Sequence, residues 1–244
     1  MYAFPFFDSL GQIWERKIGV EPRHQEGVQN AEVSLTSLET RDLAVGRDAV
    51  FFSNLNLSLQ AGDTLVVRGE SGRGKTTLLL TLVGMLPPKA GEICWSGIAI
   101  ADIDTNHLRR GVGYAGADPF LLDITIRDNL LFGSQGREVG DAELDQALWC
   151  AAGEFVQALP LKKDTLLKED GDGVSAGQKQ RIALARALIL KPNVLFLDEA
   201  MANVDEPTEA IIMTRVRELY PDIIIIAVSH RSSMRRWATK IVDL

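Results

Sequence analysis

The run Gly69-Glu70-Ser71-Gly72-Arg73-Gly74-Lys75-Thr76-Thr77 decides the fold that we predict for this chain. It matches the pattern G-x-x-x-x-G-K-[ST] and stands between an apolar stretch at 64–68 and a helix-like stretch at about 75–85. Glycines let a backbone curl so closely that its N–H groups point at one anion, and the N-terminus of the next helix adds positive potential. This order of strand, loop and helix predicts a site for the phosphate groups of a nucleotide.

Individual residues of this loop have expected tasks. We expect Lys75 to reach the β- and γ-phosphates, and the hydroxyl of Thr76 to ligate Mg²⁺. The other residues of the predicted nucleotide site lie in the same loop, and they are Gly69, Glu70, Ser71, Gly72, Arg73, Gly74 and Thr77. The predicted cofactors are therefore ATP and Mg²⁺.

A second motif is the apolar run 193–197, which ends in Asp198 and Glu199. In an open parallel sheet, ligands bind at the carboxyl ends of the strands, and these two carboxylates would stand there. Asp198 would hold Mg²⁺ directly or through water, and Glu199 would be the general base for the attacking water. Alone, this motif is better explained as an ordinary solvated strand end, so its interpretation as a site depends on the phosphate-binding loop.

The rest of the chain alternates between strand-like and helix-like stretches. The predicted strands are 64–68, 194–197, 223–228 and one near 241, and the predicted helices are about 75–85, 176–190 and 206–219. This alternation predicts an α/β fold with a mainly parallel sheet. The stretch 118–172 has helical character, and Asp141 is expected to cap one of its helices.

Two further stretches have a strand-like pattern. The pattern becomes strand-like from about Leu35, and Phe51 to Leu59 alternates in part. The stretch 93–100 predicts a small hairpin that turns at Ser96-Gly97. We expect these stretches to form an antiparallel β subdomain beside the parallel core.

The segment Val174-Ser175-Ala176-Gly177-Gln178-Lys179-Gln180-Arg181 stands at the start of a predicted helix. It resembles the signature motif of ABC ATPases, usually Leu-Ser-Gly-Gly-Gln. The resemblance implies a P-loop NTPase core, RecA-like, in which Ser175, Ala176, Gly177 and Gln178 contact ATP that is bound to another subunit. A helix N-terminus with a hydroxyl and little side-chain bulk suits an anion.

Other motifs follow in the order of that family. Ala202-Asn203-Val204-Asp205 resembles the D-loop, with Asp205 at its acidic position, and His230 resembles the switch histidine that would hydrogen-bond the γ-phosphate. The segment 122–133 is similar to one in ABC exporters. The segment 165–173 resembles the exporter X-loop, with Glu169 as its acidic residue. The likeness covers about 35–244 and implies contact with the transmembrane domains of an exporter.

Besides the conservative changes Val174 and Ala176 in the signature-like motif, the sequence departs from the family at two places. Ala117 stands where a glutamine is expected before Asp-Pro-Phe, and an alanine side chain neither ligates Mg²⁺ nor orients water. No aromatic residue stands near Val45, where the adenine-stacking residue is usual; Tyr2, Phe4 and Phe51 are candidate replacements.

The resemblance also implies a division of the chain. We predict an N-terminal lead-in or linker at 1–30 and an ABC ATPase domain at 31–244, with 33–115 and 176–244 as its core and 116–175 as the inserted helical subdomain. The lead-in either packs on the domain's own surface or connects to a membrane domain.

Composition narrows the classes of partner. The net charge is −7 and the pI about 5.1, which argues against a nucleic-acid partner. No stretch approaches the roughly 18 to 20 apolar residues of a transmembrane helix, so a membrane role would come through a partner chain or through a part outside this sequence. The cysteines Cys94 and Cys150 are expected to be reduced. The expected location is the cytoplasmic face of a membrane, peripherally bound.

Three alternatives stay open. The chain is a hydrolysing domain of an exporter, working as a homodimer or heterodimer; or it is the mainly ATP-binding half of a heterodimer; or it is a soluble ABC ATPase that acts on ribosomes or DNA. Ala117 favours the second, whereas Glu199 and His230 oppose it.

Overall fold

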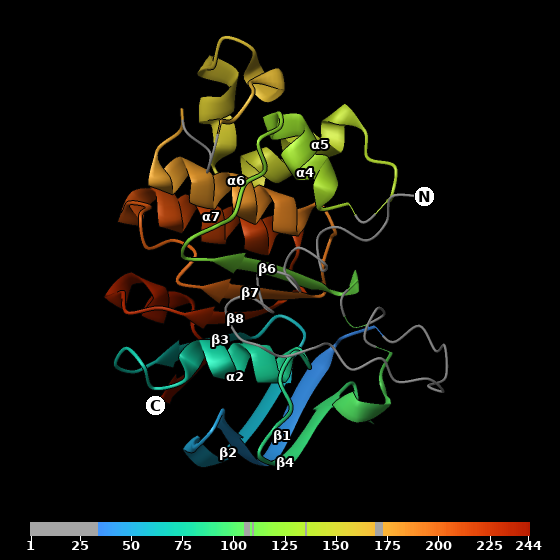
Figure 1. Ribbon diagram of the computed structural model, residues 1–244, viewed down its shortest axis with the longest axis vertical. Helices are drawn as coiled ribbons and strands as arrows, with labels where there is room; N and C mark the ends of the chain where they lie inside the picture. The colour runs from blue at the N-terminus through green and yellow to red at the C-terminus, as the bar shows by residue number, and fades with distance from the viewer. Residues whose placement is uncertain (1–33, 105–107, 109, 135, 169–172) are drawn as a thin grey trace. The chain divides into compact units, whose positions relative to one another are not determined.

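The computed structural model describes residues 34–104, 108, 110–134, 136–168 and 173–244 (Figure 1). The described residues fall into two compact units. The sheet unit consists of those in 34–113, 193–198 and 222–244, and the helical unit of those in 114–192 and 199–221. The predicted lead-in at 1–30, with Tyr2 and Phe4, lies outside the described residues.

The five-stranded sheet carries the strands that the phosphate loop and the Asp-Glu motif follow. Its spatial order is β6 (Val112–Gly116), β7 (Val194–Asp198), β8 (Ile224–Val228), β3 (Thr64–Arg68) and β9 (Lys240–Asp243). The pairs β7–β8, β8–β3 and β3–β9 are parallel. β7 and β8 are buried along their whole length, which explains their unbroken apolar sequences.

The sheet unit also holds a four-stranded antiparallel sheet. Its order is β2 (Val50–Gln60), β1 (Ser37–Gly46), β4 (Ala90–Trp95) and β5 (Ile98–Ala99). Helix α2 (Lys75–Leu82) lies between the two sheets and packs on β1, β7 and β8 (Figure 1). Trp95 is fully buried, and its indole N–H donates to the carbonyl of Leu82 at 2.9 Å, which ties β4 to the end of α2.

The remaining short elements of this unit are local. Ser96 and Gly97 have φ values of 50° and 78°, so the predicted hairpin turn is confirmed. The described part of this unit also includes the 3₁₀ helices η1 (Ile100–Asp102) and η5 (Ser232–Trp237).

Apart from the end of β6, the elements that the structure describes in the helical unit are helices. They are α4 (Ile126–Phe132), α5 (Asp141–Cys150), η2 (Gly153–Ala158), η3 (Lys162–Asp164), α6 (Ala176–Leu188) and α7 (Glu206–Leu219). Helices α4 and α5 pack against α6, and α5 also packs against α7 (Figure 1).

The start of α4 explains why the exporter-like segment has its sequence. The Thr125 hydroxyl caps the helix by accepting from the Asp128 amide at 3.0 Å. Asn129 is fully buried, and its side chain accepts from the Leu122 amide at 2.9 Å and donates to the Leu122 and Thr125 carbonyls at 3.0 Å. One amide side chain therefore fixes the turn that precedes the helix.

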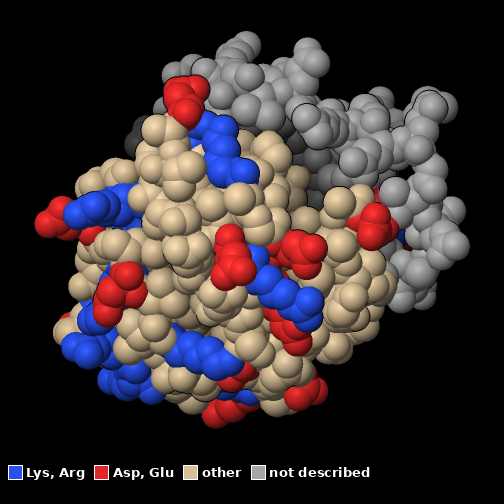
Figure 2. All heavy atoms as spheres, turned by 90° about the horizontal axis from the view of Figure 1, so that it is seen from below, with Lys and Arg blue, Asp and Glu red and all other residues tan. Residues whose placement is uncertain are grey.

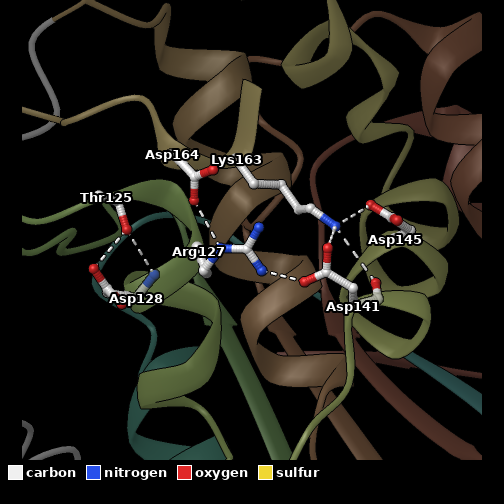
Figure 3. Close-up of polar contacts among 7 residues, drawn as sticks. All are labelled: Thr125, Arg127, Asp128, Asp141, Asp145, Lys163 and Asp164. Atoms are coloured by element: carbon white, nitrogen blue, oxygen red, sulfur yellow. Dashed lines mark hydrogen bonds and ion pairs between the residues drawn. The ribbon is translucent and has the colours of Figure 1, made fainter. Parts of the chain in front are cut away.

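Ion pairs connect α4, α5 and η3 (Figure 3). The Arg127 guanidinium lies between Asp141 and Asp164, and it donates to Asp164 at 2.7 Å. The Lys163 ammonium points at Asp145, 2.6 Å away, and at Asp141. Hydrogen bonds from Arg127 and then Lys163 lower the pKa of Asp141. The prediction that Asp141 caps α5 was wrong: Gly140 is the N-cap, and the Asp141 carboxylate is engaged with the two cations.

The α/β fold class is confirmed, with a mainly parallel sheet, an antiparallel sheet and a helical part. Strand β6 was not predicted. In the part of the chain that the structure describes, no helix is both long and apolar enough to span a bilayer.

Candidate functional site

The phosphate loop follows β3 directly and has the backbone that its glycines permit. Gly74 has φ 87°, which favours glycine, and a Cβ added there would lie 2.6 Å from a ring carbon of Phe51. Gly69 has φ 148°, and a Cβ there would lie 2.7 Å from the Leu244 carbonyl oxygen. Neither position accepts a side chain without rearrangement.

The side chains of the loop are arranged around Lys75. Its ammonium donates to the Gly69 and Glu70 carbonyls, both at 2.9 Å, and the residue is buried, so the cation is held inside the loop. Thr76 follows in the first turn of α2 and is exposed. Glu70 and Arg73 form only a loose, exposed ion pair at 3.9 Å, which contributes little to stability.

The sheet register brings three predicted parts of the site to one edge. Asp198 on β7 stands opposite Val228 on β8, and Val228 stands opposite Val67 on β3. The chain runs on from this row into the phosphate loop after β3 and into His230 after β8. The exposed His230, the buried Asp198 and the loop therefore share the carboxyl edge of the parallel sheet, where ligands bind in open α/β folds.

These residues fit a magnesium ion. Mg²⁺ usually keeps several waters and takes one or two protein oxygen atoms together with phosphate oxygens. The Asp198 carboxylate at the strand end and the Thr76 hydroxyl at the start of α2 are ligands of this kind.

Glu199 directly follows Asp198 and belongs to the helical unit. Its φ is 55°, an uncommon value for a residue other than glycine. Such backbone strain persists only where the surroundings enforce it, and it is concentrated at functional sites. The Glu199 carbonyl accepts from the Ala202 amide at 3.0 Å, which closes a turn behind it.

The signature-like segment forms the N-terminus of α6. The Ser175 hydroxyl accepts from the Gln178 amide at 3.2 Å, and the Gln178 side chain accepts from the Ser175 amide at 2.8 Å, which is a capping box. Ser175 and Ala176 are exposed. A Cβ on Gly177 would lie 2.4 Å from the Asn203 carbonyl oxygen, so glycine here allows the D-loop backbone to pack on the helix.

Asp205 has a structural task of its own. Its carboxylate caps α7 by accepting from the Thr208 amide at 2.9 Å and from the Thr208 hydroxyl at 2.8 Å. These two hydrogen bonds lower the pKa of Asp205.

Residue by residue, the structure separates the predicted site into two sets. The sheet unit carries the loop from Gly69 to Thr77, Asp198 and His230, and the helical unit carries Glu199, Ser175 to Gln178 and Asp205. Glu169 and the centre of the predicted X-loop lie outside the described residues.

One residue of the helical unit was not predicted as part of the site. The Gln180 side chain is buried and joins two loops, donating to the Ala117 carbonyl at 2.7 Å and accepting from the Asn203 amide at 2.9 Å. A sequence signal exists, because Gln180 falls on the side of α6 that is otherwise apolar.

The fold and this edge of the sheet define a P-loop protein that binds nucleoside triphosphates. The model of the family described as ABC transporter matches residues 52–202, and the chain belongs to that family.

The chain is similar to the ATP-binding parts of longer proteins. It is 34% identical over 224 residues to the probable microcin-H47 secretion/processing ATP-binding protein MchF of Escherichia coli, covering 88% of this chain and 31% of that protein. It is 31% identical over 219 residues to the ATP-dependent lipid A-core flippase of Haemophilus influenzae, covering 88% of this chain and 37% of that protein. The chain thus spans about a third of these relatives.

A solved structure agrees in fold. A bacterial Atm1-family ABC exporter with ATP bound superposes with a TM-score of 0.84 at 28% identity, covering 98% of this chain and 42% of that one. The predicted resemblance to exporter ATP-binding domains is confirmed.

Proposed function

We propose that this chain is the ATP-binding and ATP-hydrolysing domain of an ABC exporter, and that ATP-driven dimerisation powers the export. Asp198 lies at the carboxyl edge of the parallel sheet, and the phosphate loop and His230 follow neighbouring strands at the same edge. This common edge is the observation that carries the proposal. The printed names of the relatives, a secretion protein and a flippase, support the direction of transport.

The proposed chemistry assigns one task to each residue. Lys75, whose ammonium already lies inside the loop, contacts the β- and γ-phosphates. Thr76 and Asp198 hold Mg²⁺, which supplies charge neutralisation on the phosphates. Glu199 takes the proton of the attacking water, and His230 hydrogen-bonds the γ-phosphate, while the bond to the bridging oxygen breaks to give ADP and phosphate. The transition state is loose, so positioning and charge account for most of the acceleration.

The second half of the site comes from another subunit in this proposal. Ser175 and Ala176 are exposed at the start of a 13-residue helix, and such an N-terminus attracts an anion. A two-fold dimer would place this helix start of each copy at the phosphates of the other copy and form two equal sites.

The adenine base is proposed to stack on Phe51. The ring lies against Gly74 of the phosphate loop while 42% of the residue stays exposed, so an aromatic surface is available beside the phosphates. This places the stacking residue on β2, one position before Phe52, which pairs with Val45, the usual neighbourhood of that residue.

The membrane part would be supplied by the transmembrane domains of an exporter, at the cytoplasmic face of the membrane. On the face shown in Figure 2, the described Lys and Arg side chains are interspersed with Asp and Glu. This mixed charge supports a protein partner over a nucleic acid, which selects for a basic stripe.

A second candidate is the mainly ATP-binding half of a heterodimer. The observation that favours it is Ala117, whose methyl group offers no ligand to Mg²⁺ or water.

ATP turnover in the presence of Mg²⁺ distinguishes the two. The Glu199→Gln variant should retain ATP binding and lose turnover by about a hundredfold or more, because removing a general base typically costs 10²–10⁴ in rate. The control is Glu218→Gln, the same change at an exposed position of α7. Turnover by Glu199→Gln that equals wild type would contradict the assigned base, and an inactive wild type that binds ATP would favour the second candidate.

A further inference from the structure

A buried amide in α6 connects two loops that the proposed function places at the ATP site. Gln180 is 1% exposed, and both ends of its side-chain amide are used. Its Nε2 donates to the Ala117 carbonyl, 63 residues away in sequence, at 2.7 Å, and its Oε1 accepts from the Asn203 amide, 23 residues away, at 2.9 Å.

Both partners are backbone groups, so this bridge fixes the backbone position of each loop. Buried polar groups are nearly always paired, because leaving one unpaired is costly. A side chain that meets two loops in this way fixes each loop relative to α6. The Ala117 loop has a second attachment to the same helix, because Arg186 donates to the Phe120 carbonyl at 2.9 Å.

The loop at Asn203 leads directly to Glu199. The Ala202 amide donates to the Glu199 carbonyl at 3.0 Å, and the Asn203 carbonyl packs on Gly177 of α6. Asp205 anchors the far end of the loop by capping α7. Glu199 itself holds a left-handed backbone conformation, which depends on such surroundings.

We propose that Gln180 is a positioning residue for ATP hydrolysis: it ties loop 199–205 to the segment at Ala117 and thereby holds Glu199 in its working conformation. Gln180 acts only through backbone groups. Because Ala117 contributes its carbonyl oxygen, this connection is independent of the glutamine side chain that the family usually carries there. The inference rests on the proposed function, since its effect is measured as turnover.

The test compares two variants of this chain, assayed together with its transmembrane domains in membrane vesicles. Gln180→Met keeps the shape of the side chain and removes both hydrogen bonds. Gln180→Glu keeps the acceptor for the Asn203 amide, but its carboxylate cannot donate to the Ala117 carbonyl. The control is Gln146→Met, the same change at an exposed position of α5.

We expect kcat of Gln180→Met to fall about ten- to a hundredfold, since small displacements of a catalytic group have effects of this size. ATP affinity should stay within about twofold, because the phosphate loop is attached elsewhere. The kcat of Gln180→Glu should rise towards that of wild type as the pH falls. Burial raises the pKa of a carboxyl group, and the protonated carboxyl can donate to the Ala117 carbonyl again. The kcat of Gln180→Met relative to wild type should not change with pH.

A second measurement keeps the test independent of turnover. Amide hydrogen exchange at 199–205 should be faster in Gln180→Met than in wild type, while exchange in α2 should be unchanged. Unchanged kcat in a folded Gln180→Met, or unchanged exchange at 199–205, would overturn the inference. An inactive wild type would instead overturn the proposed function, and the exchange data would still decide whether Gln180 holds the loop.

Discussion

At the scale of single residues, the phosphate loop shows how one missing side chain makes room for another. Gly74 carries a positive φ and no Cβ, and the ring of Phe51 occupies the space that a Cβ would need. The ring is thereby brought beside the N-terminus of α2, where the phosphates of ATP are expected. The residue stays 42% exposed beside this helix start, so the ring has a surface that a base can stack on.

Replacing Phe51 with alanine is expected to weaken ATP binding. Loss of a stacked ring typically removes about 1 kcal/mol, which corresponds to about a fivefold rise in the dissociation constant. The matched control is Phe52→Ala, because successive strand residues point to opposite faces of the sheet. Equilibrium titration with ATP and with GTP measures both variants. Equal affinities for Phe51→Ala and wild type would contradict the stacking role.

At the scale of elements, α6 serves three purposes along its length. At its start, the N-cap residue Ser175 and Gln178 form a capping box, and Gly177 leaves room for the D-loop backbone. Further along, Gln180 bridges two loops. A helix start that is capped by its own residues keeps its geometry without a ligand. The exposed hydroxyl of Ser175 therefore has both a structural task and a proposed ligand contact.

Two substitutions at Ser175 separate these tasks. Ser175→Ala should lower stability by about 1 kcal/mol through loss of the cap. Ser175→Asp should keep the cap, since aspartate is a good N-cap residue, yet it should abolish the ATP-dependent dimer because its carboxylate repels the γ-phosphate. Thermal unfolding measures the first effect and scattering in the presence of ATP the second. A Ser175→Asp variant that dimerises with ATP as wild type does would argue that this helix start contacts no nucleotide.

The elements also show which parts of the fold are readable from sequence. Helix α7 was predicted at its observed limits because Asp205 and Pro207 are local start signals, and the turn at Ser96-Gly97 was readable for the same reason. Strand β6 was missed because the glycines in Val112–Gly116 hide any strand pattern.

The candidate site was readable only where its residues follow local motifs. The phosphate loop, Asp198 and His230 each follow an apolar strand, and their common edge follows from parallel pairing. Two features could not be derived from local motifs: the left-handed backbone of Glu199 and the partners of Gln180, one of which lies 63 residues away. The place of Gln180 on an apolar helix side signals only that its amide is buried and needs partners. Both are set by tertiary contacts, which no short window of sequence contains.

At the scale of the whole molecule, the proposed site has two parts that different copies of the chain would supply. One is the loop from Gly69 to Thr77, which would hold the phosphates, and the other is the helix start at Ser175, which would close over them. If the closing helix comes from a second copy, each site of a two-fold dimer contains the loop of one copy and the helix of the other. A substitution in the loop of one copy and a substitution in the helix start of the other copy then fall in the same site of a mixed dimer.

This arrangement makes a complementation prediction. Lys75→Ala should disable the loop and Ser175→Asp the helix start, so each variant alone should be inactive. In a mixed dimer, both changes meet in one site and the other site is intact. When the copies are held together through their transmembrane domains, pairing does not depend on ATP, and random mixing makes about half of the dimers mixed. Each mixed dimer has one of two sites working, so about a quarter of wild-type turnover should return.

The measurement is Mg²⁺-dependent ATP turnover of an equimolar mixture against each variant alone, with and without a chelator. The recovered turnover should depend on Mg²⁺, because the metal supplies positive charge to the phosphates and its proposed ligands, Thr76 and Asp198, carry none. If the mixture is no more active than its parts and does not associate with ATP, two copies of this chain do not share a site. The closing helix would then belong to a different chain, as in the heterodimer that Ala117 favours.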